Sequence, residues 1–154
     1  MSDIDPIGSR QTSGRIEGRM HRLPLRVYFA DTDAAGLVYH STFLDFAERG
    51  RTEMLRLLGF DHVQLRQDGL VFVVRHCDID YLRPAKLDDL LEVRSHLTEL
   101  GGSTLSLKQT IWRDGQDLVR LAIRLVCVRA DGRPTRVPPQ VRGFLEDFLT
   151  LSGS

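Results

Sequence analysis

The densest group of side chains that could do chemistry lies between Asp31 and His40, where two aspartates precede a tyrosine and a histidine. Carboxylates and imidazoles are common proton carriers in enzymes, so this segment could supply general acid–base chemistry. Aspartate and glycine also dominate ordinary turns and helix caps, and spacing alone leaves that structural reading open. A calcium loop is excluded, because Ala35 stands at its fifth position and Thr42 stands where a bidentate glutamate is required.

This segment lies between a predicted strand and a predicted helix. The strand covers residues 25–29, which are rich in aromatic and β-branched side chains. The helix runs from about Ser41, a suitable N-cap, to Leu58, and Gly59 is expected to end it. Its apolar residues recur at three- and four-residue steps: Phe43, Phe46, Ala47, Met54, Leu57 and Leu58. Gly50 costs about 1 kcal/mol against alanine in mid-helix, which predicts a close contact there with a packed surface.

After the helix the apolar pattern changes to a period of two, which predicts four strands over residues 71–82, 90–100, 104–112 and 118–129. Gly101-Gly102 and Asp114-Gly115 suit two-residue hairpins, because they tolerate positive φ. A short helix is expected over residues 141–149, after Pro138-Pro139. This order predicts an α+β domain in which a five-stranded antiparallel sheet wraps one long central helix. Such a sheet has open edges, so we expect a homodimer or a homotetramer.

The composition is that of an ordinary globular protein, with 42% hydrophobic and 27% charged residues. The 21 basic and 21 acidic residues balance, which argues against nucleic acid as a partner. Cys77 and Cys127 lie in apolar, strand-like runs and are expected to be buried thiols rather than a disulfide. No apolar run approaches the ~20 residues of a membrane span, and no secretion signal is visible. We therefore expect no membrane insertion and a cytoplasmic location.

Residues 1–22 differ from the rest of the chain. The polar stretch 9–15 lacks periodicity, so residues 1–22 are expected to be a flexible leader and residues 23–150 the folded domain. Residues 16–19, Ile-Glu-Gly-Arg, resemble a processing-protease site used in expression vectors, and Met20 follows directly. The leader is a vector remnant, a mis-assigned start or a natural extension, and the sequence leaves these alternatives open.

The segment from Arg26 to His40 resembles the signature of the 4-hydroxybenzoyl-CoA thioesterase-like hotdog family, and is most similar to its Tol-Pal-associated acyl-CoA thioesterase branch. The similarity spans roughly residues 23–145 and continues through residues 46–55, 72–75, 81–85 and 87–89. Its most specific part is the motif from Asp33 to His40. The resemblance implies a hotdog fold and hydrolysis of acyl-CoA thioesters to a free acid and coenzyme A. It also implies that Asp33 is the catalytic carboxylate, as nucleophile or general base, and that His40 assists.

Physical chemistry supports these implied roles. The resemblance places the backbone N–H of His40 at the thioester carbonyl, where the partial positive charge of a helix start stabilises an oxyanion. One such donor is typically worth roughly 10²- to 10³-fold in rate, and a general base on the order of 10²- to 10⁴-fold. Partial burial of Asp33 would raise the pKa of its carboxyl and make it a better base. Asp31 is expected to cap the loop, and Tyr39 to pack or to line an acyl pocket.

The remaining candidates give weaker signals. Neither a metal site nor a resident cofactor is expected, because no metal spacing links the histidines outside the motif, which are His62, His76 and His96. A solvated helix face is expected for three arginines, with a contact to a partner subunit or a ligand phosphate as the alternative: Arg49, Arg51 and Arg56. The resemblance implies that basic residues bind the phosphates of coenzyme A, and the candidates are Arg83, Lys86, Arg129, Arg133 and Arg136.

Hydrolysis of an acyl-CoA, or of an acyl carrier protein thioester, is the leading hypothesis. No G-x-S-x-G elbow, Walker loop or dinucleotide fingerprint is present in the chain. The alternatives are a hydroxyacyl-thioester dehydratase on the same fold and a non-catalytic acyl-CoA-binding protein, since one scaffold hosts many chemistries. A motif placed before the helix favours hydrolysis over dehydration.

Overall fold

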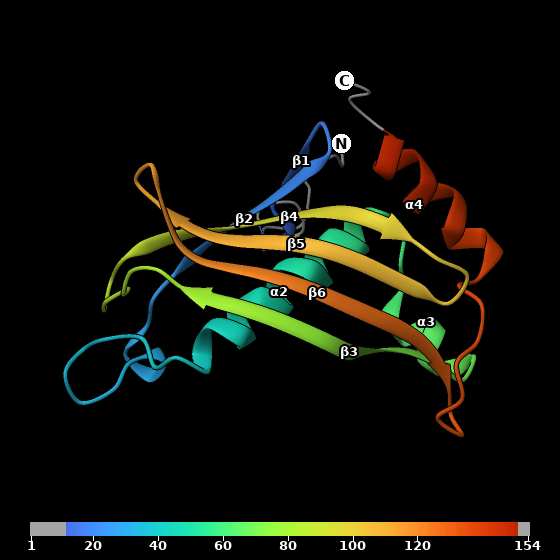
Figure 1. Cartoon of the computed structure of the whole chain (residues 1–154), viewed down its shortest axis with the longest axis horizontal. Coiled ribbons are helices and arrows are strands. Elements are labelled where there is room, and N and C mark those ends of the chain that lie inside the picture. The colour runs from blue at the N-terminus through green and yellow to red at the C-terminus, as the bar shows by residue number, and fades with distance from the viewer. Residues whose placement is uncertain (1–11, 151–154) are drawn as a thin grey trace, which may run out of the picture.

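The computed structural model describes residues 12–150 (Figure 1). Its strands are β1 (Arg15–Glu17), β2 (Met20–Arg26), β3 (Leu70–Tyr81), β4 (Leu90–Leu100), β5 (Thr104–Arg113) and β6 (Gln116–Arg129). Its helical segments are the 3-10 turn η1 (Phe29–Asp31) and the α-helices α2 (Thr42–Leu57), α3 (His62–Gln67) and α4 (Pro139–Thr150). No helix in this described part of the chain is long and apolar enough to cross a membrane.

The strands of the described residues form one antiparallel sheet in the order β1-β2-β4-β5-β6-β3, so β1 and β3 are its edges. Figure 1 shows α2 behind this sheet, where it contacts β1, β2, β4 and β5. The predicted arrangement of an antiparallel sheet around one long helix is therefore confirmed. The sheet has six strands between residues 12 and 150 rather than the five expected.

The first long strand lies earlier in the chain than predicted. It occupies β2 rather than residues 25–29, and it pairs with β4. Leu23, Leu25 and Val27 alternate as buried residues, whereas Tyr28 and Phe29 are 65% and 81% exposed. The prediction followed the aromatic residues, but the alternation of apolar side chains decides which residues face the core.

The extra strand comes from the segment that was assigned to the leader. Residues 15–22 form β1 and the first part of β2, and His21 is fully buried. The expectation of flexibility is therefore wrong for residues 15–22, because they are paired with the rest of the sheet. Residues 12–14 are also described, and the hydroxyl of the buried Ser13 donates to Glu53 Oε1 at 2.9 Å. Residues 1–11, the rest of the expected leader, lie outside the described residues.

The long helix agrees with its prediction at both ends. Ser41 occupies the N-cap position, although its side chain makes no capping hydrogen bond, and Gly59 follows the helix with a φ of +98°. Positive φ is readily adopted by glycine, which explains the stop at this residue. The buried face differs from the prediction in two apolar residues, because Leu55 is 3% exposed and Leu57 is 41% exposed.

Gly50 marks the point where α2 lies closest to the sheet. A Cβ at this residue would lie 2.4 Å from Val93 Cγ1 and 3.3 Å from Gln109 Nε2. The amide of Gln109 donates hydrogen bonds of 2.8 Å to Ala47 O on the helix and 2.8 Å to Ser95 Oγ on the sheet. The predicted close contact is confirmed, and a buried amide fixes the helix to the sheet beside it.

The hairpins follow two different geometries. Asp114 and Gly115 both have positive φ, +48° and +82°, as predicted for a two-residue turn between β5 and β6. The turn between β4 and β5 instead spans residues 101–103, and neither Gly101 nor Gly102 has positive φ. The two-residue turn predicted there is therefore wrong, because a third residue completes the connection. The short α3 was not predicted.

Cys77 and Cys127 are free thiols, as expected. Cys127 is buried and Cys77 is half-buried, and burial raises the pKa of both thiols. Cys77 lies opposite Ile123 and Cys127 lies opposite Phe72 in the β3–β6 pairing, so the two are several residues apart along the ladder.

Candidate active site

The motif forms a compact loop between η1 and α2. Thr32 and Val38 form an isolated antiparallel bridge, and inside it the Asp33 N–H donates to Leu37 O at 2.8 Å. The Gly36 N–H donates to Asp33 O at 3.0 Å, and Gly36 has a φ of +80°, which glycine adopts without strain. These hydrogen bonds hold residues 33–37 in a tight turn, and this turn fixes the position of the Asp33 backbone.

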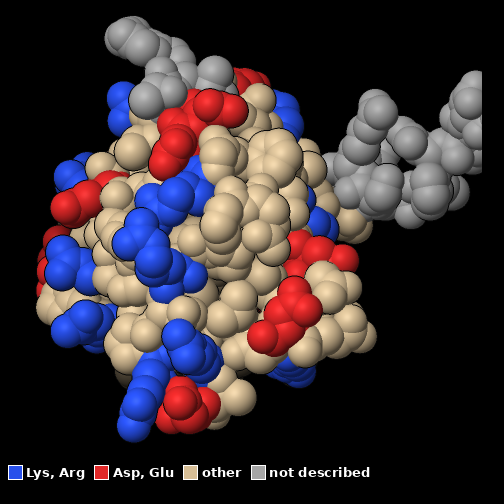
Figure 2. Space-filling model, turned by 90° about the vertical axis from the view of Figure 1, so that its right-hand side faces the viewer, with Lys and Arg blue, Asp and Glu red and all other residues tan. Residues whose placement is uncertain are grey.

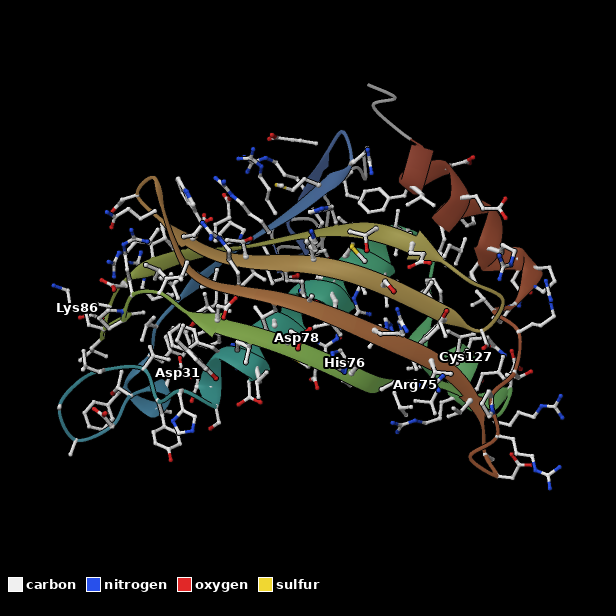
Figure 3. All side chains as sticks on the ribbon, in the orientation of Figure 1. Asp31, Arg75, His76, Asp78, Lys86 and Cys127 are labelled. Atoms are coloured by element: carbon white, nitrogen blue, oxygen red, sulfur yellow. The ribbon has the colours of Figure 1, made fainter. Side chains whose placement is uncertain are left out.

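The loop between β3 and β4 contacts the motif loop through its backbone. The Val38 N–H donates to Ala85 O at 2.9 Å, and Leu37 forms an isolated bridge with Lys86. The labelled residues Asp31 and Lys86 lie at the same end of the molecule, away from α4 (Figure 3). The motif is therefore anchored to the segment that connects β3 to β4.

Asp33 has its two carboxylate oxygens in different roles. Oδ1 accepts hydrogen bonds from the N–H of Ala35 at 2.8 Å and the N–H of Leu37 at 3.1 Å. No hydrogen bond within the described residues uses Oδ2. The residue is exposed, so the partial burial expected for it is not present in the single chain. One oxygen thus positions the carboxylate, and the other stays available for chemistry.

His40 lies just before the start of α2. Its backbone C=O accepts a hydrogen bond of 3.0 Å from the Tyr81 hydroxyl, and partial burial raises the pKa of that hydroxyl. Its imidazole is exposed, with ring centroids 4.3 Å from Tyr39 and 6.3 Å from Tyr81. Its backbone N–H donates to no acceptor among the described residues. Tyr81, at the end of β3, therefore places a free amide donor at the helix start.

Asp31 has the structural role expected for it. Its Oδ2 accepts from the Tyr28 N–H at 2.8 Å, which closes the η1 turn, and its backbone C=O accepts from the Tyr39 N–H at 3.4 Å. Tyr39 is 53% exposed, so it does not pack in the core of the single chain. The loop is held by Asp31, which leaves Asp33 as the acidic side chain of the motif that is directed to solvent.

The expected basic residues are divided between the two ends of the molecule. Lys86 pairs with Leu37 of the motif, and Arg83, three residues earlier on the same connecting segment, donates through Nη1 to Asp117 O at 2.7 Å. The other three are exposed near the end of β6 and before α4, namely Arg129, Arg133 and Arg136. Figure 2 views that second end and shows Lys and Arg side chains gathered in a band across it. Within one chain, a single phosphate group cannot contact both sets.

Hollows near the motif are lined by other residues. A hollow of about 420 Å³ lies behind the loop, against Leu37, Lys86 and Arg113. Another of about 370 Å³ lies between α2, α3 and β3. A larger one of about 570 Å³ lies on the outer face of the sheet around Ala122, away from the motif. The single chain thus holds the reactive groups at its surface rather than in a closed pocket.

The histidines outside the motif lie apart from one another. His76, labelled in Figure 3, contacts Asp78 at 3.2 Å on the exposed side of β3. His62 is on α3, and His96 is on β4. No cluster of three metal-binding side chains occurs between residues 12 and 150.

Sequence reasoning placed one helix arginine wrongly. Arg49 and Arg56 are exposed as expected, but Arg51 is half-buried and lines the hollow between α2, α3 and β3. A signal for this existed, because Arg51 lies four residues after Ala47 and four before Leu55, two members of the buried face. Tyr81 was also missed, since its contact with His40 joins segments 41 residues apart.

Comparisons with known proteins agree with this arrangement. A family model described as the thioesterase-like superfamily matches residues 27–145. The chain is 41% identical over 121 residues to the acyl-CoA thioesterase YbgC of Haemophilus influenzae, covering 77% of this chain and 89% of that protein. It is 42% identical over 110 residues to the acyl-CoA thioester hydrolase YbgC of Escherichia coli O6:H1, covering 71% and 82%. A probable thioesterase from Bartonella henselae has a similar structure, with a TM-score of 0.74 and 39% identity over 77% of this chain and 99% of that one.

Proposed function

The chain belongs to the thioesterase-like superfamily, and we propose that it hydrolyses acyl-CoA thioesters with Asp33 as the catalytic carboxylate. The observation that carries this assignment is that the two carboxylate oxygens of Asp33 differ. Oδ1 accepts hydrogen bonds from the loop backbone, whereas Oδ2 has no hydrogen bond among the described residues. The unpaired N–H of His40 lies at the start of α2, where the helix adds partial positive charge. In this proposal the carboxylate and the amide donor act on the same thioester carbonyl.

The reaction then follows from these groups. Asp33 Oδ2 attacks the carbonyl carbon directly or takes a proton from an attacking water. The carbonyl oxygen becomes an oxyanion, which the His40 N–H and the helix start stabilise. The C–S bond breaks, and the thiolate of coenzyme A takes up a proton as it leaves. In the direct route, water then hydrolyses the anhydride between the acyl group and Asp33, which releases the free acid and restores the carboxylate. The exposed imidazole of His40 is a proton carrier at the correct end of α2 for this last transfer.

A substitution of Asp33 by asparagine tests the assignment. Asparagine retains an oxygen that can accept the two loop N–H groups, so the loop should keep its form while the charge is lost. We expect kcat/KM for thiol release from a panel of aliphatic and aromatic acyl-CoAs to fall on the order of 10²- to 10⁴-fold.

Asp31→Asn is the matched control, because its carboxylate bonds only to the loop backbone and an amide oxygen can replace it there. This variant should keep activity close to that of the unsubstituted chain. Unchanged turnover of every substrate by Asp33→Asn would contradict the assignment. Hydration of an enoyl-CoA without thiol release would instead favour the dehydratase alternative.

The same proposal includes a homodimer formed through β3. This edge strand has exposed apolar residues, and Val71, Val73 and Val74 are 43%, 40% and 48% exposed. The opposite edge, β1, has only three residues, of which two are charged. An exposed apolar edge is a ready partner for a second strand, whereas a short charged edge is not.

Antiparallel pairing centred on the middle of β3 has a consequence for the site. Tyr81, at the C-terminal end of β3, donates a hydrogen bond to His40 O, so the motif lies at this end of β3. In such a dimer the C-terminal end of β3 in one copy lies beside residues 70–74 of the second copy. Those residues line the hollow of about 370 Å³. The dimer therefore joins the reactive loop of one copy to the hollow of the other.

Sedimentation of the chain and of two lysine variants tests the dimer. Val73→Lys places a charge on the β3 edge and should shift the chain to monomer, because a buried unpaired charge is unfavourable. Val63→Lys is the control, since Val63 is 68% exposed on α3. A chain that sediments as a monomer, or a Val73→Lys variant that remains dimeric, would contradict this interface.

A further inference from the structure

The hollow between α2, α3 and β3 is mainly apolar but has a polar group at its wall. Its apolar lining includes Leu55, Leu65, Phe72 and Leu125. Its polar lining includes Glu48, Arg51 and Thr52 from α2 and His62 from α3. Pockets for small molecules typically combine an apolar wall with a few polar groups that fix orientation. The polar groups of this hollow therefore indicate what kind of molecule it accepts.

Arg51 has no partner of its own within the described residues. It makes no ion pair within 4.0 Å and no side-chain hydrogen bond there, and burial lowers its pKa. The other half-buried arginines of residues 12–150 all have a carboxylate or carbonyl partner, as seen in Arg22, Arg94, Arg113 and Arg142. A half-buried guanidinium that has no ion-pair partner among the described residues can gain a charge-assisted hydrogen bond from an anion, so Arg51 is a candidate anion-binding residue.

An acidic residue close to Arg51 in the sequence does not form an ion pair with it. Glu48, one turn earlier on α2, lines the same hollow and attracts the guanidinium, but it is exposed and lies beyond ion-pair distance. His62 adds a second polar side chain to the lining of the hollow. Burial lowers the pKa of His62, which favours its neutral form. The guanidinium and the neutral imidazole can both donate to a carboxylate in this hollow, which is also lined by the exposed carboxylate of Glu48.

We propose that Arg51 is a specificity-determining residue, and that the enzyme prefers acyl-CoA thioesters whose acyl chain ends in a carboxylate. This inference rests on the proposed function, including the dimer that joins the hollow to the reactive loop. The chain of the substrate lies along the apolar wall. Its terminal carboxylate is bound by Arg51, and His62 donates a further hydrogen bond to it.

The test compares thioesters of equal length that differ only at the far end. Suberyl-CoA and octanoyl-CoA form one pair, and adipyl-CoA and hexanoyl-CoA form a second. We expect a higher kcat/KM for the dicarboxylic member of at least one pair. In Arg51→Met, which keeps an unbranched apolar side chain, this ratio should fall by about 10- to 100-fold, the usual effect of losing a hydrogen bond to a charged group. Arg51→Lys should retain part of the preference.

Arg49→Met is the matched control, because Arg49 is an exposed arginine on the same helix. It should leave the ratio unchanged. A wild-type ratio at or below one for both pairs, or a ratio that Arg51→Met does not reduce, would overturn the inference. If Arg51→Met fails to fold, Arg51→Lys and the wild-type ratio still decide.

Binding separates this inference from the catalytic assignment. The dissociation constants of suberyl-CoA and octanoyl-CoA are measured calorimetrically on Asp33→Asn, with and without Arg51→Met. Tighter binding of suberyl-CoA that depends on Arg51 supports the inference even if no thioester is hydrolysed, which would contradict the proposed function alone. Hydrolysis of all four thioesters without a preference would contradict the inference alone.

Discussion

Replacing Gly50 by alanine should destabilise the fold, although alanine is the better helix former. The new methyl group would lie 2.4 Å from Val93 Cγ1, whereas carbon atoms in contact prefer about 3.5–4.0 Å. Helix and sheet must therefore separate by about 1 Å at this point. The separation acts on the Gln109 amide, which bonds to Ala47 O at 2.8 Å.

The expected magnitude follows from three terms. Overpacking a close-packed core typically costs about 1–3 kcal/mol. Weakening the Gln109 hydrogen bond adds up to about 0.5–1.5 kcal/mol. The higher helix propensity of alanine returns about 1 kcal/mol. The free energy of unfolding of Gly50→Ala should therefore fall by roughly 1–3 kcal/mol, measured by urea denaturation.

A second glycine provides the control for this prediction. Gly143 lies inside α4 with no atom within 4 Å of a Cβ built on it. Gly143→Ala should therefore stabilise the chain by up to about 1 kcal/mol. The double variant with Val93→Ala should recover part of the loss in Gly50→Ala, because it removes the clashing methyl group. An equal gain in Gly50→Ala and Gly143→Ala would refute the reasoning.

Three further outcomes are expected. Burial lowers the pKa of His21 from its ordinary value of about 6.5, so the neutral side chain stabilises the fold above about pH 6.5, and this contribution is lost as the pH falls toward the lowered pKa. The urea midpoints at pH 7.5 and pH 5.5 should therefore differ less in His21→Phe than in the unsubstituted chain. Gly115→Ala should lower the free energy of unfolding by about 1–2 kcal/mol, because φ is +82° there, and thermal unfolding would show this. Tyr81→Phe removes the hydrogen bond to His40 O and should lower kcat/KM for thiol release by about 2- to 10-fold with little change in thermal stability.

The elements that were predicted well are those with a long uniform pattern. α2 and β5 repeat their apolar residues over several turns or pairs, and Gly59 and Asp114-Gly115 follow them and mark their ends clearly. The region before residue 30 was predicted less well. β1 has three residues, too few for a pattern, and its pairing with β2 is a tertiary contact that propensity does not reveal.

The site was predictable in its residues but not in its surroundings. Asp33 and His40 are close in sequence, so a single loop brings them to the start of α2. The exposure of Asp33 was not predictable, because it depends on where the loop leaves the sheet. The Tyr81 contact and the position of Arg51 against β3 both join distant segments, and a single sequence carries little information about such pairs.

The unequal edges of the sheet limit how many copies of the chain can join by adding strands to it. A strand added to β3 uses the one long apolar edge that the described residues offer, and what remains outermost on each side is the three-residue β1 with its Arg15 and Glu17. In the proposed β3 dimer, sheet extension would therefore terminate after a single addition instead of propagating. The same asymmetry protects the folded chain against fibrous aggregation, since a fibril needs two edges that both accept new strands.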